Sequence, residues 1–142
     1  MSVNRREVRE SVFILSFEKL FRDDSADEII EIASEVGDIT LNDEVIHNFK
    51  GIIERSDELD SVIAKFSDKR TVDRIPKINL ALLRLAIYEA RYDEKVPINV
   101  AISEAVALAG KYAQEPDIAF INGVLGAYSR SDEAKSGEDT GA

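Results

Sequence analysis

Residues 78 to 90 read INLALLRLAIYEA, the most apolar segment of the chain. A helix built from this segment carries apolar side chains on nearly every face, whereas a helix at a protein surface keeps one face polar. A helix that is apolar all round has to be covered by other elements. We therefore expect this helix to run through the middle of a domain, with the neighbouring segments packed around it.

On both sides of this segment, apolar residues recur at spacings of three and four, which predicts helices with one buried face. Ser25 with Glu28 matches a capping box at the start of a helix. Pro97 suits the first turn of another helix, and Pro116 with Asp117 indicates a stop followed by an N-cap. The predicted helices span residues 4–21, 26–35, 42–55, 56–66, 78–90, 97–112 and 118–129.

The predicted fold class is therefore all-α, a compact bundle of about six to seven helices. A chain of 142 residues is most simply one domain, and we place that domain at residues 1–129. The polar residues 67–73 are expected to form a linker. Residues 130–142 contain no apolar side chain larger than alanine, so we expect a disordered polar tail.

Composition excludes several classes of protein. The chain has no cysteine, which rules out disulfides, thiolate metal sites and a cysteine nucleophile. His47 is the single histidine, so we expect no metal and no cofactor. The phosphate-binding and catalytic motifs of P-loop, dinucleotide-binding, α/β-hydrolase and zincin proteins do not occur. No apolar run approaches the ~20 residues of a membrane span, and no secretory signal opens the chain. These features predict a cytoplasmic protein without a membrane partner.

Positive charge is concentrated at the amino end of an acidic protein. The net charge is −10, yet Arg5, Arg6 and Arg9 fall within five positions. Arg5 and Arg9 repel each other one turn apart, at a cost of a few tenths of a kcal/mol. Cations at a helix N-terminus also oppose the helix dipole. Two small penalties in one place indicate a use, and the planar guanidinium suits phosphate.

Two further features have competing interpretations. Arg84 lies inside the apolar helix, where a guanidinium needs a partner; a structural pair with Glu89 or Glu104 competes with a catalytic or partner-binding role. Gly123 in a helix interior costs ~1 kcal/mol against alanine and permits close approach of another helix or a ligand. Phe120 beside it is either a core residue or an exposed stacking platform.

Four segments in this order and spacing resemble the NusB family of bacterial transcription antitermination factors. They are RREVRESVFILSFEKLF at 5–21, ALLRLAIYEA at 81–90, VPINVAISEAVALAGKYA at 96–113 and FINGVLGAY at 120–128. Each segment is modest alone, and the four in register are specific. The likeness extends from residue 4 to about residue 129. The chain departs from the family pattern at Asn79 and Leu80, where an acid and a basic residue are frequent, and at Gly110, where a lysine is usual.

The resemblance implies an all-helical fold of two packed subbundles and no enzymatic activity. It also implies that the protein pairs with NusE, a small-subunit ribosomal protein, binds boxA RNA with it, and joins an antitermination complex on RNA polymerase. A homodimer is a further possible assembly. The resemblance assigns RNA binding to Arg5, Arg6, Arg9, Lys111 and Phe120, partner binding to Arg74 and Asn79, and an architectural ion-pair set to Arg84, Glu89 and Glu104.

Two other functions remain open at the level of sequence. One is a helical adaptor that binds proteins without contacting RNA, which the departure at Asn79 and Leu80 favours. The other is a small all-α enzyme with a site built from Arg84 and Glu104, which would require a pocket around the guanidinium. The resemblance favours RNA binding over both, whereas the arginine cluster taken alone also fits a solvated helix start.

Overall fold

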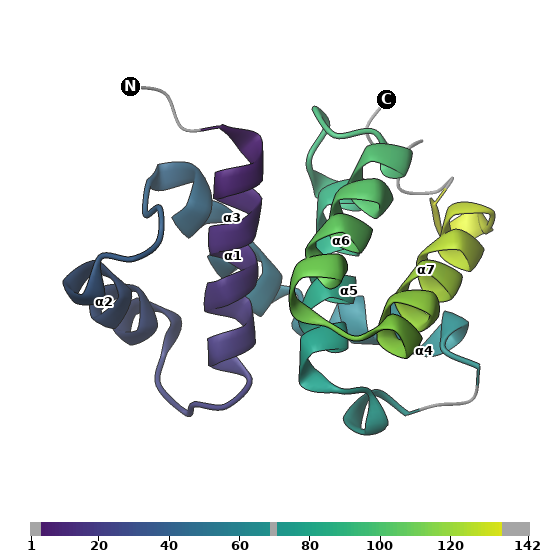
Figure 1. Ribbon diagram of the computed structural model, residues 1–142, viewed down its shortest axis with the longest axis horizontal. Coiled ribbons are helices and arrows are strands. Elements are labelled where there is room, and N and C mark those ends of the chain that lie inside the picture. The colour runs from purple at the N-terminus through teal and green to yellow at the C-terminus, as the bar shows by residue number, and fades with distance from the viewer. Residues whose placement is uncertain (1–3, 69–70, 135–142) are drawn as a thin grey trace. The chain divides into compact units, whose positions relative to one another are not determined.

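The computed structural model describes residues 4–68 and 71–134, and within these ranges every regular element is helical (Figure 1). The all-α prediction is confirmed. The elements are α1 (Arg5–Lys19), α2 (Ala26–Val36), α3 (Asp43–Glu54), α4 (Ser56–Phe66), the 3-10 helix η1 (Val72–Arg74), α5 (Lys77–Tyr92), α6 (Ile98–Tyr112) and α7 (Glu115–Ser129).

The chain divides into two compact units, Met1–Arg55 and Ser56–Ala142. The first contains α1 to α3 and the second contains α4 to α7. The boundary was not evident in the sequence as a linker, because Arg55 alone separates the end of α3 at Glu54 from the start of α4 at Ser56. The single domain expected over residues 1–129 thus comprises two units, in keeping with the two subbundles that the resemblance implied.

In the N-terminal unit, each of the three helices packs against the other two. Polar caps fix where these helices begin. Asn4 caps α1 and Asn42 caps α3, each through a side-chain oxygen that accepts a backbone N–H. Ser25 and Glu28 form the predicted capping box of α2, and Gly37 ends that helix at φ 74°, a left-handed conformation that glycine adopts without strain.

The C-terminal unit is built around α5, which packs against α4, α6 and α7 (Figure 1). Side chains from Asn79 to Leu83 and from Leu85 to Glu89 are buried, so the helix is enclosed on nearly all sides. The central position predicted from its composition is confirmed for this unit. Arg84 alone interrupts the buried run.

Two predicted boundaries were wrong, those of the linker and of the last long helix. Within the expected linker, Val72–Arg74 form η1, and residues 69–70 lie outside the described ranges. Helix α7 begins at Glu115 with Pro116 in its first turn, so Pro116 does not end a segment. Proline is tolerated there because first-turn N–H groups have no partner inside the helix.

The expected disorder from residue 130 onward is also wrong for the residues that the structure describes. Residues 132–134 form a helical turn, and Ala134 is buried. Residues 135–142 lie outside the described ranges. The energy for ordering this turn comes from charge as well as from apolar burial, which the composition of the tail did not reveal.

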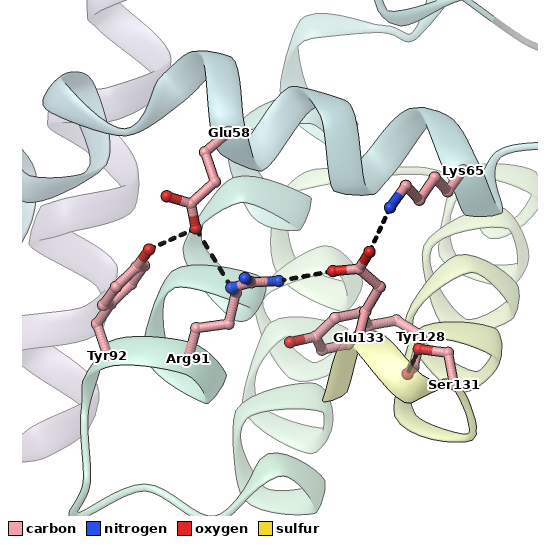
Figure 2. A network of polar contacts seen from close by, with 7 residues as sticks. All are labelled: Glu58, Lys65, Arg91, Tyr92, Tyr128, Ser131 and Glu133. Atoms are coloured by element: carbon pink, nitrogen blue, oxygen red, sulfur yellow. Dashed lines mark hydrogen bonds and ion pairs between the residues drawn. The ribbon is translucent and has the colours of Figure 1, made fainter. Parts of the chain in front are cut away.

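An ionic network joins this last turn to α4 and α5 (Figure 2). Arg91 lies at its centre, with Nη1 3.2 Å from Glu133 Oε2 and Nε 3.3 Å from Glu58 Oε2. Lys65 also pairs with Glu133, and the Tyr92 hydroxyl donates to Glu58. Hydrogen bonds from Lys65 and Arg91 hold the pKa of Glu133 below its ordinary value.

We predict that Glu133→Gln destabilises the protein by about 1 kcal/mol at neutral pH, because an ion pair with two cations is lost. A carboxylate with a lowered pKa stabilises the folded state above its unfolded pKa. That contribution disappears as pH falls through the folded pKa. The stability difference between wild type and variant, measured by urea unfolding from pH 7 downward, should therefore shrink in acid.

Asp132→Asn is the matched control, because Asp132 is an exposed neighbour of Glu133 and the variant removes the same charge. It should leave stability within about 0.5 kcal/mol of wild type. Equal stabilities for the two variants across the pH range would contradict the role given to Glu133.

Candidate nucleic-acid interface

The arginine cluster occupies the first two turns of α1, at a position set by the helix cap. The Asn4 side-chain oxygen accepts the Glu7 backbone N–H at 2.8 Å, and its amide donates to Glu7 Oε1 at 2.9 Å. Helix α1 therefore begins at Arg5. The carboxylate of Glu7 offsets the unfavourable interaction of the arginines with the positive end of the helix dipole.

The three arginines differ in exposure. Arg5 and Arg6 are exposed, whereas Arg9 is only 7% exposed. Arg5 Nη1 lies 2.6 Å from Glu44 Oε2 at the start of α3, and both side chains remain open to solvent, at 47% and 40%. Arg5 and Arg6 thus present charge to solvent, while the burial of Arg9 makes it the weakest phosphate ligand of the three.

In the C-terminal unit, α6 and α7 pack side by side and carry the other two RNA-binding candidates (Figure 1). Lys111 is exposed in the last turn of α6, with its Nζ 5.5 Å from the centre of the Tyr112 ring. Phe120 is half-buried in α7, a state between the core and platform interpretations. The ring is therefore neither enclosed in the core nor fully open to solvent.

Two glycines near these residues are not required by the packing of the unit. A Cβ added at Gly110 or Gly123 would meet no heavy atom within 4 Å, and both positions are exposed. The predicted close approach of another helix at Gly123 is therefore wrong for the described part of the chain. Asn122, the neighbour of Gly123, is exposed as well.

The two partner-binding candidates, Arg74 and Asn79, differ in exposure. Arg74 is exposed on η1. Asn79 is 1% exposed, and its amide donates to Asp117 Oδ1 at 3.1 Å. Burial argues against direct contact between this side chain and a partner, and partner binding by Asn79 stays a prediction. Its role is to join the first turn of α5 to the first turn of α7.

Arg84 forms a structural pair, as expected, but with a different partner. Its Nε donates to Asp60 Oδ1 at 2.8 Å and its Nη2 to Asp60 Oδ2 at 2.7 Å, a two-pronged arrangement that fits the planar guanidinium. The predicted pairing of Arg84 with Glu89 or Glu104 is wrong, because α4 presents Asp60 to this part of α5. The guanidinium that the enzyme interpretation requires is therefore held by Asp60.

The sequence did not single out three carboxylates that matter in the structure. By local sequence Asp60 suits a solvated helix start, and Glu44 and Glu133 belong to no motif. Each pairs with a cation from a different helix or segment. Sequence spacing gives pairs within one helix and says nothing of pairs between helices.

Over residues 4–68 and 71–134, no three His, Asp or Glu side chains are grouped as metal ligands. Within the same ranges, no helix combines the length and apolar character needed to cross a membrane.

A model of the NusB family matches residues 6–130. The transcription antitermination protein NusB of Acetivibrio thermocellus is 40% identical over 126 residues, covering 87% of each chain. The protein of the same name from a Thermoanaerobacter species is 38% identical over 137 residues, covering 96% of this chain and 97% of its own.

Solved structures share the fold. A structure of T. maritima NusB has a TM-score of 0.80 at 28% identity, covering 96% of this chain and 99% of that one. A structure of the antitermination factors NusB and NusE in complex with double-stranded RNA has a TM-score of 0.75 at 24% identity, covering 87% and 94%. At that identity the likeness shows the fold alone.

We predict that Gly123→Ala stabilises the protein by about 0.5–1 kcal/mol, because alanine is the better helix former and the added methyl group meets nothing. Thermal or urea unfolding measures the change. Gly37→Ala serves as the opposite control, since a left-handed residue strains alanine and should lower stability. A destabilising Gly123→Ala would show that a contact requires glycine there.

Proposed function

This chain belongs to the NusB family, and we propose that it is a transcription antitermination factor that binds boxA-type single-stranded RNA together with ribosomal protein NusE. Its relatives bear the name of transcription antitermination proteins, which also argues against an enzyme. The complex would join RNA polymerase during transcription of ribosomal RNA, in the cytoplasm.

The observation that carries the RNA-binding part is the pair of exposed guanidinium groups at the start of α1. With a net charge of −10, the body of the protein repels nucleic acid in general. Repulsion from distant carboxylates is screened beyond about 8 Å at physiological salt. Arg5 and Arg6 therefore can hold phosphates locally, while the acidic surface limits binding at other places. Arg9 would add to the positive electrostatic potential at the site from its buried position, without direct contact with the RNA.

The C-terminal unit would supply contacts to the bases. Single-stranded RNA exposes base faces, and stacking on an aromatic ring contributes ~1–3 kcal/mol per base. Phe120 is the candidate ring, and the exposed Lys111 on α6 adds a further cation for the backbone. Half-burial of Phe120 fits a ring that is held in place by the unit and offers one face.

NusE is the proposed protein partner. A solved structure of this fold holds NusB and NusE with RNA, and Arg74 on η1 is the exposed residue that remains from the predicted partner surface. Self-association into a homodimer would cover the arginines. Sedimentation should therefore establish whether the protein is a monomer or a homodimer at the concentrations used to measure RNA binding.

A second candidate function is a protein-binding adaptor that does not contact RNA. The buried Arg9 and the pairing of Arg5 with Glu44 favour it, because both reduce the positive charge offered to phosphate. Replacing Arg5 and Arg6 by alanine distinguishes the two functions, since RNA binding by an adaptor does not depend on these arginines.

We predict that Arg5→Ala with Arg6→Ala weakens binding of boxA-like RNA by at least about ten-fold, from loss of two charge-assisted contacts of about 1 kcal/mol each. The slope of log affinity against log salt should fall in magnitude by about 1.4, at about 0.7 per phosphate contact for single strands. Fluorescence titration at several salt concentrations, with scrambled RNA alongside, measures both.

Lys19→Ala with Arg22→Ala is the matched control, because it removes the same charge at and just beyond the opposite end of α1, about 20 Å along the helix from Arg5 and Arg6. Its affinity should stay within about two-fold of wild type, since most of such a distant effect is screened. If the two pairs of substitutions weaken binding equally, binding follows net charge, and the assignment to α1 fails.

We also predict that RNA tightens the pair with NusE by the same factor by which NusE tightens RNA binding, because linkage makes the coupling reciprocal. Calorimetric titration of the protein with NusE, with and without saturating boxA-like RNA, measures the factor. Equal affinities in the two titrations would count against a shared RNA surface.

A further inference from the structure

One arginine of the proposed RNA site already binds an anion within its own unit. Arg5 Nη1 and Glu44 Oε2 are 2.6 Å apart, although the residues are 39 positions apart in the chain. Both ends of this contact are fixed by helix caps, because Asn4 sets the start of α1 and Asn42 sets the start of α3. Helices α1 and α3 pack against each other, so the carboxylate is presented to the guanidinium by the fold.

We propose that Glu44 is a built-in competitor of RNA phosphate at Arg5, and that it sets the affinity of the proposed site. This inference rests on the proposed function. A carboxylate and a phosphate make the same charge-assisted hydrogen bonds to a guanidinium, so both cannot use the same edge of Arg5 at once. RNA that engages this edge displaces Glu44.

Replacing the Glu44 contact of Arg5 by a phosphate contact costs little free energy in the geometry observed. The Arg5 and Glu44 side chains are 47% and 40% exposed, so water hydrates both groups when the contact between them breaks. Exposed pairs of this kind are weak. A displaced Glu44 also keeps a favourable location, since it belongs to the first turn of α3, where the positive end of the helix dipole attracts a carboxylate.

Displacement does not remove the negative charge from the neighbourhood. Glu44 stays on α3, and its charge repels an incoming phosphate over distances up to the Debye length, about 8 Å at physiological salt. An isolated anion gains one contact against this repulsion, whereas an RNA strand that also reaches Arg6 gains several. Glu44 therefore favours a polyanion over small phosphate compounds.

The test compares Glu44→Gln with Asp43→Asn. Asp43 is the exposed neighbour of Glu44 in the same turn of α3, so the two variants remove equal charge from the same end of the same dipole. Glu44 is the carboxylate whose contact with Arg5, at 2.6 Å, carries the proposal. With NusE present, Glu44→Gln should bind boxA-like RNA about two- to five-fold more tightly than Asp43→Asn, the equivalent of about 0.4–1 kcal/mol, which lies in the range typical of exposed pairs.

A second comparison tests whether the effect passes through Arg5. In an Arg5→Ala background, Glu44→Gln and Asp43→Asn should bind RNA with the same affinity, because nothing remains for Glu44 to occupy. Thermal unfolding of all variants checks that each is folded. A difference that persists without Arg5 would overturn the proposal, since Glu44 would then act on RNA by another route.

The remaining outcomes separate this inference from the proposed function. If Arg5→Ala weakens RNA binding while Glu44→Gln binds no more tightly than Asp43→Asn, the competitor role is wrong and the proposed function stands. Weaker binding by Glu44→Gln would mean that the carboxylate positions Arg5 for RNA, which also overturns the inference. If RNA binding is indifferent to Arg5→Ala and Arg6→Ala, both the competitor role and the RNA site on α1 fall.

Discussion

Burial of α5 is the constraint from which the C-terminal unit follows. A helix with apolar side chains on nearly all sides has to be enclosed, and α4, α6 and α7 enclose it. The enclosure leaves one guanidinium, Arg84, in a region where an unpaired charge would cost several kcal/mol. Asp60 on α4 satisfies it with two hydrogen bonds, so the pair also fixes how α4 lies against α5.

The N-terminal unit depends more on its helix ends. Asn4, Ser25 and Asn42 each accept a backbone N–H at the start of a helix, and these caps determine which charged side chains fall in the first turns. The cap of α1 places Arg5 and Arg6 in solvent, and the cap of α3 places Glu44 within reach of Arg5. The electrostatic character of the proposed RNA site is therefore a consequence of two caps.

The parts of the structure that follow from local pattern could be predicted. The central helix, the capping box at Ser25 and the other helix positions depend on side-chain period and on residues a few positions apart. The parts that depend on which helices pack together could not. Asp60 as the partner of Arg84, the burial of Asn79 and the anchoring of Glu133 each join elements far apart in sequence. The early start of α7 was missed because proline reads equally well as a stop and as a first-turn residue.

The most direct test of the central claim is to follow the arginine side chains during RNA binding. The Nε–Hε signals of the arginines, recorded by NMR while boxA-like RNA is added with NusE present, report each guanidinium separately. The account predicts that the signals of Arg5 and Arg6 shift in proportion to RNA bound, while those of Arg84 and Arg91, held by carboxylates of the C-terminal unit, stay in place. Saturation of the RNA with the Arg5 and Arg6 signals unmoved would contradict it.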